Sequence, residues 1–178
     1  MTIDYRLSTF KMKTTLETFQ DFPTNSRTWV YQSSRTLTDE EAKELTHLAR
    51  GFTDNWMSHG AKLPAAADVL YNRFLIMMVD ERAETAGGCS IDSSVIQIRS
   101  IQQKLNISLL DRMDLAFLNV EGALETVHAN KISDAFEHGA LTEETTVFHN
   151  IITSKAELET NWRIPLVKSW AAARLKVS

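Results

Sequence analysis

The feature that most constrains the fold is an apolar alternation that changes phase within residues 67–78. The apolar positions with this two-residue period are Ala67, Val69, Tyr71, Phe74, Ile76 and Met78. Two antiparallel strands joined by a two-residue turn at Asn72-Arg73 explain the shift, because this turn places Tyr71 opposite Phe74 on one face. A β-bulge within one long strand is an alternative. We favour the hairpin, because Asn tolerates the left-handed conformation that such a turn requires.

A helix is predicted just before this hairpin. Thr38 and Glu41 have the spacing of a capping box, in which each side chain accepts from the other residue's backbone N–H. The apolar residues that follow at three- and four-residue steps are Ala42, Leu45, Leu48, Ala49, Phe52 and Trp56. They form one buried face, and His59-Gly60 are the expected stop of the helix.

The other segments complete an α+β pattern. We expect strands at residues 28–33, 113–118 and 123–128, and a second helix from Gly87-Gly88 to about Asn106. This order predicts a ferredoxin-like β-α-β-β-α-β core with a helical C-terminal extension. The expected extension contains short helices at residues 133–138 and 154–162 and a strand or turn near residues 147–148.

The domain organisation is expected to be simple. Residues 1–21 have no clear period and are predicted to form a flexible N-terminal tail, and residues 22–178 to form one α+β domain. Met12, followed by Lys13, is an alternative translation start.

Composition narrows the class of protein. The 178 residues are 43% hydrophobic and 24% charged, as in ordinary globular proteins. The formal net charge of -4 argues against broad binding to nucleic acid, which requires an excess of Lys and Arg. No apolar run approaches the roughly 20 residues of a membrane span. One cysteine and no secretory signal indicate a reducing compartment, and the expected location is cytoplasmic.

The segment from Gly87 to Ser94 is the main candidate site. Its ligand-binding candidates are Gly88, Ser90, Asp92 and Ser93, because two glycines followed by polar residues at a helix start collect backbone N–H groups that hold an anion. Ordinary helix capping by Ser90 or Asp92 is the other interpretation. The Asp92 carboxylate would also compete with an anion for the same N–H groups. A small anionic metabolite is therefore the expected ligand.

Cys89 is the candidate nucleophile of a competing hypothesis. A thiol before a helix start favours the thiolate, and His59 is a candidate base that folding could bring near. The simpler alternative is that Cys89 is a small buried apolar residue. The five histidines show no metal-binding spacing, so no metal and no cofactor is expected. Whether the protein is an enzyme stays open.

Three arginines are further candidates. Arg35, Arg73 and Arg112 lie at predicted strand ends or turns, where their forked donors could reach a carboxylate or phosphate at the helix start. The alternative is that each forms a structural ion pair with a nearby acid. A third class of function is a homodimer or interaction module formed through an open sheet edge.

Several segments, taken in order, carry a resemblance to a known family. They are Trp29-Val30-Tyr31-Gln32 with Arg35 and Leu37, Tyr71-Asn72-Arg73-Phe74-Leu75 with Asp80-Glu81, Gly88-Cys89-Ser90-Ile91-Asp92-Ser93-Ser94-Val95, Asp111-Arg112, and Trp162, Pro165 and Ser169-Trp170. The chain resembles a small bacterial family of uncharacterised proteins often labelled "ABC transporter ATPase". That label is not supported by the residues, because the chain has no Gly-Lys pair and thus no P-loop.

Overall fold

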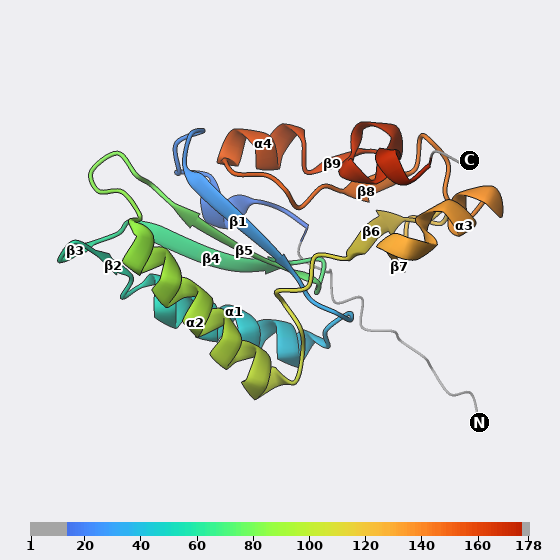
Figure 1. Cartoon of the computed structure of the whole chain (residues 1–178). Coiled ribbons are helices and arrows are strands. Elements are labelled where there is room, and N and C mark those ends of the chain that lie inside the picture. Colours follow the sequence, from blue (N-terminus) through green and yellow to red (C-terminus); the bar gives the residue numbers. More distant parts are fainter. Residues whose placement is uncertain (1–13, 176–178) are drawn as a thin grey trace, which may run out of the picture.

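The computed structural model describes residues 14–175 and is a mixed α/β fold with antiparallel sheets (Figure 1). Its strands are β1 (Arg27–Gln32), β2 (Met57–Ser58), β3 (Ala61–Lys62), β4 (Ala65–Leu70), β5 (Phe74–Val79), β6 (Asp114–Leu118), β7 (Leu124–His128), β8 (Thr146–Phe148) and β9 (Arg163–Pro165). Its α-helices are α1 (Asp39–Thr53), α2 (Gly88–Leu105), α3 (Ile132–Glu137) and α4 (Lys155–Thr160).

The first sheet has the strand order β1-β5-β4. The predicted hairpin is confirmed as β4 and β5, but its predicted register is wrong by one residue, since Leu70 and not Tyr71 lies opposite Phe74. Tyr71 and Asn72 form the turn, with φ values of 55° and 45°. The Arg73 N–H donates to the Leu70 carbonyl across it. The left-handed pair of a tight hairpin turn therefore begins one residue earlier than expected.

Helix α1 begins as the sequence predicts and ends earlier. The side chain of Thr38 accepts from the Glu41 N–H, and the Glu41 carboxylate accepts from the Thr38 N–H, so the capping box is confirmed. The helix ends at Thr53. His59 and Gly60 do not stop it, but form the turn of the small β2–β3 hairpin, with φ values of 49° and 83°.

Helix α2 runs beside α1, and the two helices cover one face of the first sheet (Figure 1). It begins after Gly87, and Asn106 ends it in the left-handed conformation with φ of 50°. The core between sheet and helices includes Tyr31, Leu45, Ala49, Trp56, Leu63, Leu75, Met77, Ile98 and Ile101. Every residue of β5 is buried, because the other face of the sheet is covered as well.

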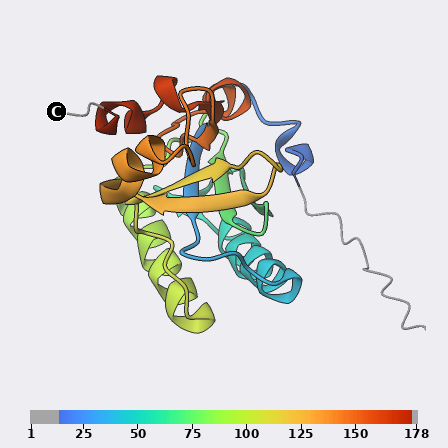
Figure 2. The same ribbon diagram turned by 90° about the vertical axis from the view of Figure 1, so that its right-hand side faces the viewer.

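The second sheet has the strand order β7-β6-β8-β9 and lies against that other face (Figure 2). A ferredoxin-like core would pair the strand after α2 with β1. Among the described residues, β6 pairs with β7 and β8 and not with β1, so the ferredoxin-like order is not confirmed. Part of the outer edge of β1 is occupied instead by residues 153–155, which turn into α4.

An aromatic cluster joins the two sheets. It contains Tyr71, Phe74, Phe148 and Trp162, with ring centroids between 4.6 and 6.2 Å apart. The guanidinium of Arg163 donates to the Tyr71 hydroxyl at 2.8 Å, which attaches β9 to the turn of the first sheet. Residues 148–162 thus cover the second face of the first sheet, while the other side of the second sheet has a separate core that includes Leu115, Phe117 and Val147.

The N-terminal segment is only partly described. Residues 1–13 of the predicted tail lie outside the described residues. Glu17–Phe19 forms a 3-10 helix, and the Phe19 side chain is fully buried against the first sheet, so this part of the predicted tail belongs to the packed domain. Within residues 14–175, no helix is both long and apolar enough to cross a membrane.

Candidate functional site

The start of α2 opens into a hollow of about 730 Å³, here called the helix-start hollow. It is lined by Phe52, Asn55, Trp56, Met57, Ser58, His59, Gly87, Gly88, Cys89, Ser90 and Ser93. These residues come from the end of α1, the β2–β3 hairpin and the first turns of α2. The hollow thus contains Gly88, Ser90 and Ser93, three of the residues that the sequence nominated as ligand-binding.

The first turn of α2 has no side-chain cap. The N–H groups of Gly88, Cys89 and Ser90 find no acceptor among the described residues, and the first intrahelical bond is donated by Ile91 to the Gly87 carbonyl. Such orphan N–H groups carry the positive end of the helix dipole. They are the part of the hollow that attracts negative charge.

The serines do not act as caps. The hydroxyls of Ser90 and Ser93 donate to the carbonyls of Gly87 and Ser90, at 2.8 and 2.7 Å. The capping interpretation of Ser90 and Asp92 is therefore wrong. Asp92 is exposed and does not line the hollow, so its expected competition with an anion does not occur there. No Asp or Glu is among the described residues that line the hollow.

His59 and Cys89 both line the hollow, although 30 positions separate them in the chain. Cys89 is exposed, which corrects the expectation of a small buried apolar residue. The His59 imidazole lies beside Gly87, since a Cβ added at residue 87 would be 2.8 Å from Nε2 of His59. A larger residue at this position would make the exposed His59 ring shift.

Three hydrogen bonds hold the walls of the hollow together. Trp56 is 1% exposed, and its Nε1–H donates to the Ser90 carbonyl at 2.9 Å. The Ser58 hydroxyl donates to the Thr85 carbonyl at 2.6 Å and accepts from the Gly87 N–H at 3.3 Å. The end of α1 and the β2–β3 hairpin are therefore both attached to the segment that begins α2.

None of the three nominated arginines lines the helix-start hollow. Arg35 forms a forked ion pair with Glu41, at 2.7 and 2.6 Å, as the ion-pair alternative predicted. The Arg35 guanidinium and the Thr38 N–H together lower the pKa of Glu41 to about 2. Arg35 thus extends the capping box of α1 and lies at the wrong end of that helix for the hollow.

Arg73 is buried and serves as a structural donor. It is 5% exposed and makes hydrogen bonds of 3.3 to 3.4 Å to the Thr36 hydroxyl, the Ser34 carbonyl and the Thr126 hydroxyl. Its Nε has no partner among the described residues. Burial lowers the pKa of Arg73, and the negative charge of Asp114 opposes this shift. Arg73 joins the turn of the first sheet to β7.

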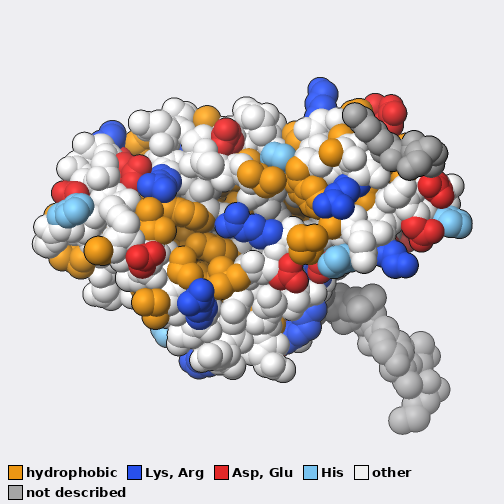
Figure 3. Space-filling model, in the orientation of Figure 1, with side chains coloured by type: hydrophobic (Ala, Val, Ile, Leu, Met, Phe, Trp, Pro, Cys, Tyr) orange, Lys and Arg blue, Asp and Glu red, His pale blue; other side chains and the backbone are white. Residues whose placement is uncertain are grey.

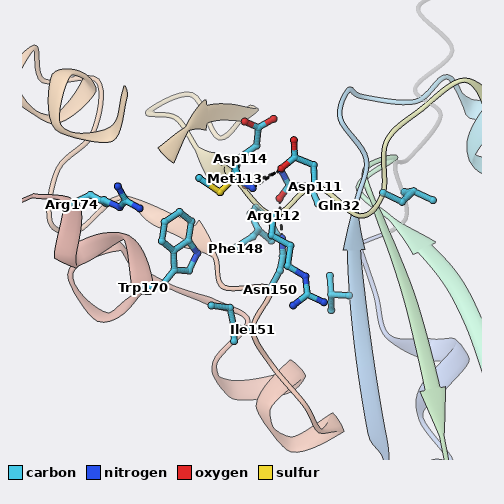
Figure 4. Close-up of a pocket in the computed structure, with 12 residues that line it drawn as sticks. Gln32, Asp111, Arg112, Met113, Asp114, Phe148, Asn150, Ile151, Trp170 and Arg174 are labelled. Carbon is cyan, nitrogen blue, oxygen red and sulfur yellow. Dashed lines mark hydrogen bonds between the residues drawn. The ribbon is translucent and has the colours of Figure 1, made fainter. Parts of the chain in front are cut away.

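Arg112 lines a second hollow, which the sequence did not nominate. This inter-sheet cleft has a volume of about 310 Å³ and lies between β1 and the second sheet (Figure 4). It is lined by Val30, Gln32, Leu109, Asp111, Arg112, Met113, Asp114, Phe148, Asn150, Ile151, Trp170 and Arg174. Apolar side chains and Lys or Arg side chains lie next to one another across the middle of this face (Figure 3).

A chain of amide hydrogen bonds fixes one wall of the cleft. The Asn150 side chain donates to Gln32 Oε1 at 2.9 Å and accepts from Trp162 Nε1 at 2.9 Å. Gln32 Nε2 donates to the Asp114 carbonyl at 3.2 Å. Gln32 and Asn150 are 118 positions apart. No local motif marks such a pair, which is why sequence reasoning missed the cleft.

Comparison with protein-family models, with curated proteins and with solved structures gives no match. The family resemblance of the sequence therefore stays a prediction. Within residues 14–175, no group of three or more His, Cys, Asp or Glu side chains is placed to hold a metal ion.

Proposed function

We propose that the protein binds a small anionic molecule, with a phosphate or carboxylate group, in the helix-start hollow. One observation carries the proposal: the three residues with unused N–H groups at the start of α2 line a hollow that no described acidic side chain lines. Helix starts with free N–H groups bind phosphate and carboxylate because the hydrogen bonds and the helix dipole act together. Arg35, Arg73 and Arg112 have no part in this site.

The side chains around these N–H groups suit the same ligand. The side-chain amide of Asn55 lies in the lining; its nitrogen donates one N–H to the Gly51 carbonyl at 2.9 Å and has a second N–H for a ligand. The His59 ring lies beside Gly87, where a ring N–H can donate a hydrogen bond to the ligand. Phe52, Trp56 and Met57 supply apolar surface for the rest of the ligand.

The test is calorimetric titration with inorganic phosphate and a panel of phosphorylated and carboxylated metabolites. Gly87→Ala places a methyl group 2.8 Å from His59 Nε2 and forces the ring to move. We expect binding to weaken about tenfold, as for the loss of one hydrogen bond to a charged group. Gly51→Ala is the matched control, because its new methyl group meets nothing within 4 Å and Gly51 does not line the hollow. A flat response across the panel would rule out the proposal.

A second candidate function is nucleophilic catalysis by Cys89. The observation in its favour is that Cys89 and His59 line one hollow with the N–H groups that would hold a developing oxyanion. His59 would take the thiol proton, and the thiolate would attack a carbonyl carbon. Because Cys89 is the only cysteine, its alkylation rate can be followed directly.

Alkylation separates the two candidates. Slower alkylation of Cys89 in the presence of phosphate supports anion binding at the helix start. Fast alkylation without protection by phosphate favours the nucleophile. Cys89→Ser that leaves every measurable activity unchanged would exclude catalysis by Cys89. For either function we infer a cytoplasmic location, since an exposed single thiol suits a reducing compartment.

A further inference from the structure

The outer edge of β1 has unused backbone groups. The Ser33 N–H donates to the Arg73 carbonyl on the β5 side, so odd-numbered residues of β1 face β5. The Thr28 N–H donates to the Thr153 carbonyl on the opposite side, so even-numbered residues face outward. Val30 N–H, Val30 C=O and Gln32 N–H therefore point into the inter-sheet cleft. No hydrogen bond within residues 14–175 uses them.

Part of this edge already carries an antiparallel segment. The Thr28 N–H bonds to the Thr153 carbonyl at 3.0 Å, and the Lys155 N–H bonds to the Ser26 carbonyl at 2.9 Å. Continuing the same register would place Ile151 opposite Val30. Instead, a space of about 170 Å³ opens between β1 and the segment that precedes Thr153, and it adjoins the inter-sheet cleft at Val30, Arg112, Asn150 and Ile151. Pairing along β1 thus stops where the cleft begins.

The cleft offers positive charge without a described counter-ion. Arg112 and Arg174 line it, and neither side chain has an ion pair or hydrogen bond to another described residue. Two acids also line it, but in Figure 4 the carboxylates of Asp111 and Asp114 point away from the Arg112 guanidinium. The Asp111 carboxylate accepts from the Met113 N–H.

The rim of the cleft is apolar. Met113 and Ile151 are 45% and 59% exposed, and Trp170 lies across the cleft from β1 (Figure 4). A ligand for this site needs backbone N–H and C=O groups for β1, an apolar side chain for the rim and a negative charge for the arginines. An extended peptide segment with an acidic side chain has all three.

We propose that the inter-sheet cleft binds an extended, acidic peptide segment of a partner protein as an added strand beside β1. The segment occupies the position that the fourth strand of a ferredoxin-like sheet would take. Exposed edges accept strands in this way, with main-chain hydrogen bonds for affinity and side-chain contacts for selectivity. This site is independent of the helix-start hollow.

The test uses a displayed library of random eight-residue peptides, selected on the full chain. We expect the selected peptides to combine acidic and apolar residues in alternation. In a fluorescence anisotropy assay, Arg112→Gln should weaken their binding about tenfold, since it removes a charge-assisted hydrogen bond. Arg99→Gln is the matched control, because Arg99 is exposed on α2 and lines none of the described pockets. Binding to this variant should be unchanged.

A backbone measurement decides whether the peptide is a strand. Bound peptide should slow the exchange of the Val30 and Gln32 amide hydrogens, and Val30→Pro should weaken binding at least tenfold by removing one donor. If Val30→Pro does not fold, amide exchange and Arg112→Gln decide the result. The proposal is overturned if no peptide is enriched or if the selected peptides bind Arg112→Gln equally well. It is also overturned if the two amides are already protected in the free protein, because another segment or a second copy then covers the edge.

Discussion

The helix-start hollow and the inter-sheet cleft obtain their polar groups in different ways. The hollow uses three N–H groups of one helical turn, and nearby residues of the first half of the chain hold that turn in place. The cleft uses side chains from segments up to 142 positions apart, between Gln32 and Arg174. The hollow is therefore a local feature that the first half of the chain can build. The cleft exists only after the two halves have packed together.

A buried tryptophan stabilises each site in a comparable way. Trp56 donates from its indole nitrogen to the Ser90 carbonyl beside the helix-start hollow, at 2.9 Å. Trp162 donates to Asn150 Oδ1 beside the inter-sheet cleft, also at 2.9 Å. The two rings belong to the cores on opposite faces of the first sheet. Because the two tryptophans lie in different cores, a substitution of one of them should disturb one site and leave the other intact.

The largest effect is expected from removing either ring. Trp56→Ala and Trp162→Ala should each lower the free energy of unfolding by about 3–5 kcal/mol, because each leaves a cavity in a closed core. Urea denaturation followed by circular dichroism measures the loss. Val120→Ala is the control, since Val120 is fully exposed and should change stability by less than about 0.5 kcal/mol. If only Trp162→Ala is tolerated, the second sheet contributes less to the fold than its packing indicates.

A smaller and unequal effect is expected from the polar links. Asn150→Ala removes the partner of both Gln32 and Trp162, and should cost about 1–3 kcal/mol because it leaves buried polar groups unpaired. Ser58→Ala removes the links to Thr85 and Gly87 beside the hollow and should cost about 1 kcal/mol. The same denaturation assay compares the two variants. Equal losses would mean that the cleft depends no more on its side chains than the hollow does.

The smallest effect concerns a residue that belongs to neither site. Arg35 holds the pKa of Glu41 near 2, below its ordinary value of 4.5, so this pair stabilises the fold above pH 4.5 and loses its effect as the pH falls toward 2. Glu41→Gln should therefore flatten the dependence of stability on pH in that range. Arg35→Gln should do the same and leave anion and peptide binding at pH 7 unchanged. If Arg35→Gln changed the affinity for anions or for peptides, Arg35 would be a residue of that binding site.

Short-range signals predicted much of the first half of the fold. The capping box of Thr38 and Glu41 and the phase change before Phe74 act over a few residues, so their structures could be inferred locally. The placement of β6 could not be inferred locally. It depends on which sheet buries more of the apolar side chains Leu115, Ala116 and Phe117, and the two sheets contain residues that are far apart in the sequence. The predicted register of β4 and β5 was wrong by one residue because the left-handed turn residues are Tyr71 and Asn72, whereas the sequence pattern predicted a turn at Asn72 and Arg73.

The candidate sites also differ in whether local or long-range contacts determine them. The helix-start hollow could be predicted from residue types alone, because four of its lining residues lie within one short segment: Gly88, Cys89, Ser90 and Ser93. His59 is far from Cys89 in the sequence, and only the fold brings both residues to the hollow. The arginines were assigned by expected strand ends, and only the packed structure shows that Arg35 has its own carboxylate and that Arg73 is buried.

The bond between Arg163 and the Tyr71 hydroxyl has a consequence for how the chain is made. Tyr71, Phe74 and their neighbours on β4 and β5 are covered by Phe148 and Trp162, which leave the ribosome many residues later. During synthesis one apolar face of the first sheet therefore stays exposed until these later residues have been made. A chain that stops before Trp162 would present this face to chaperones and proteases, and we expect such truncated products to be degraded rather than to accumulate as half-domains.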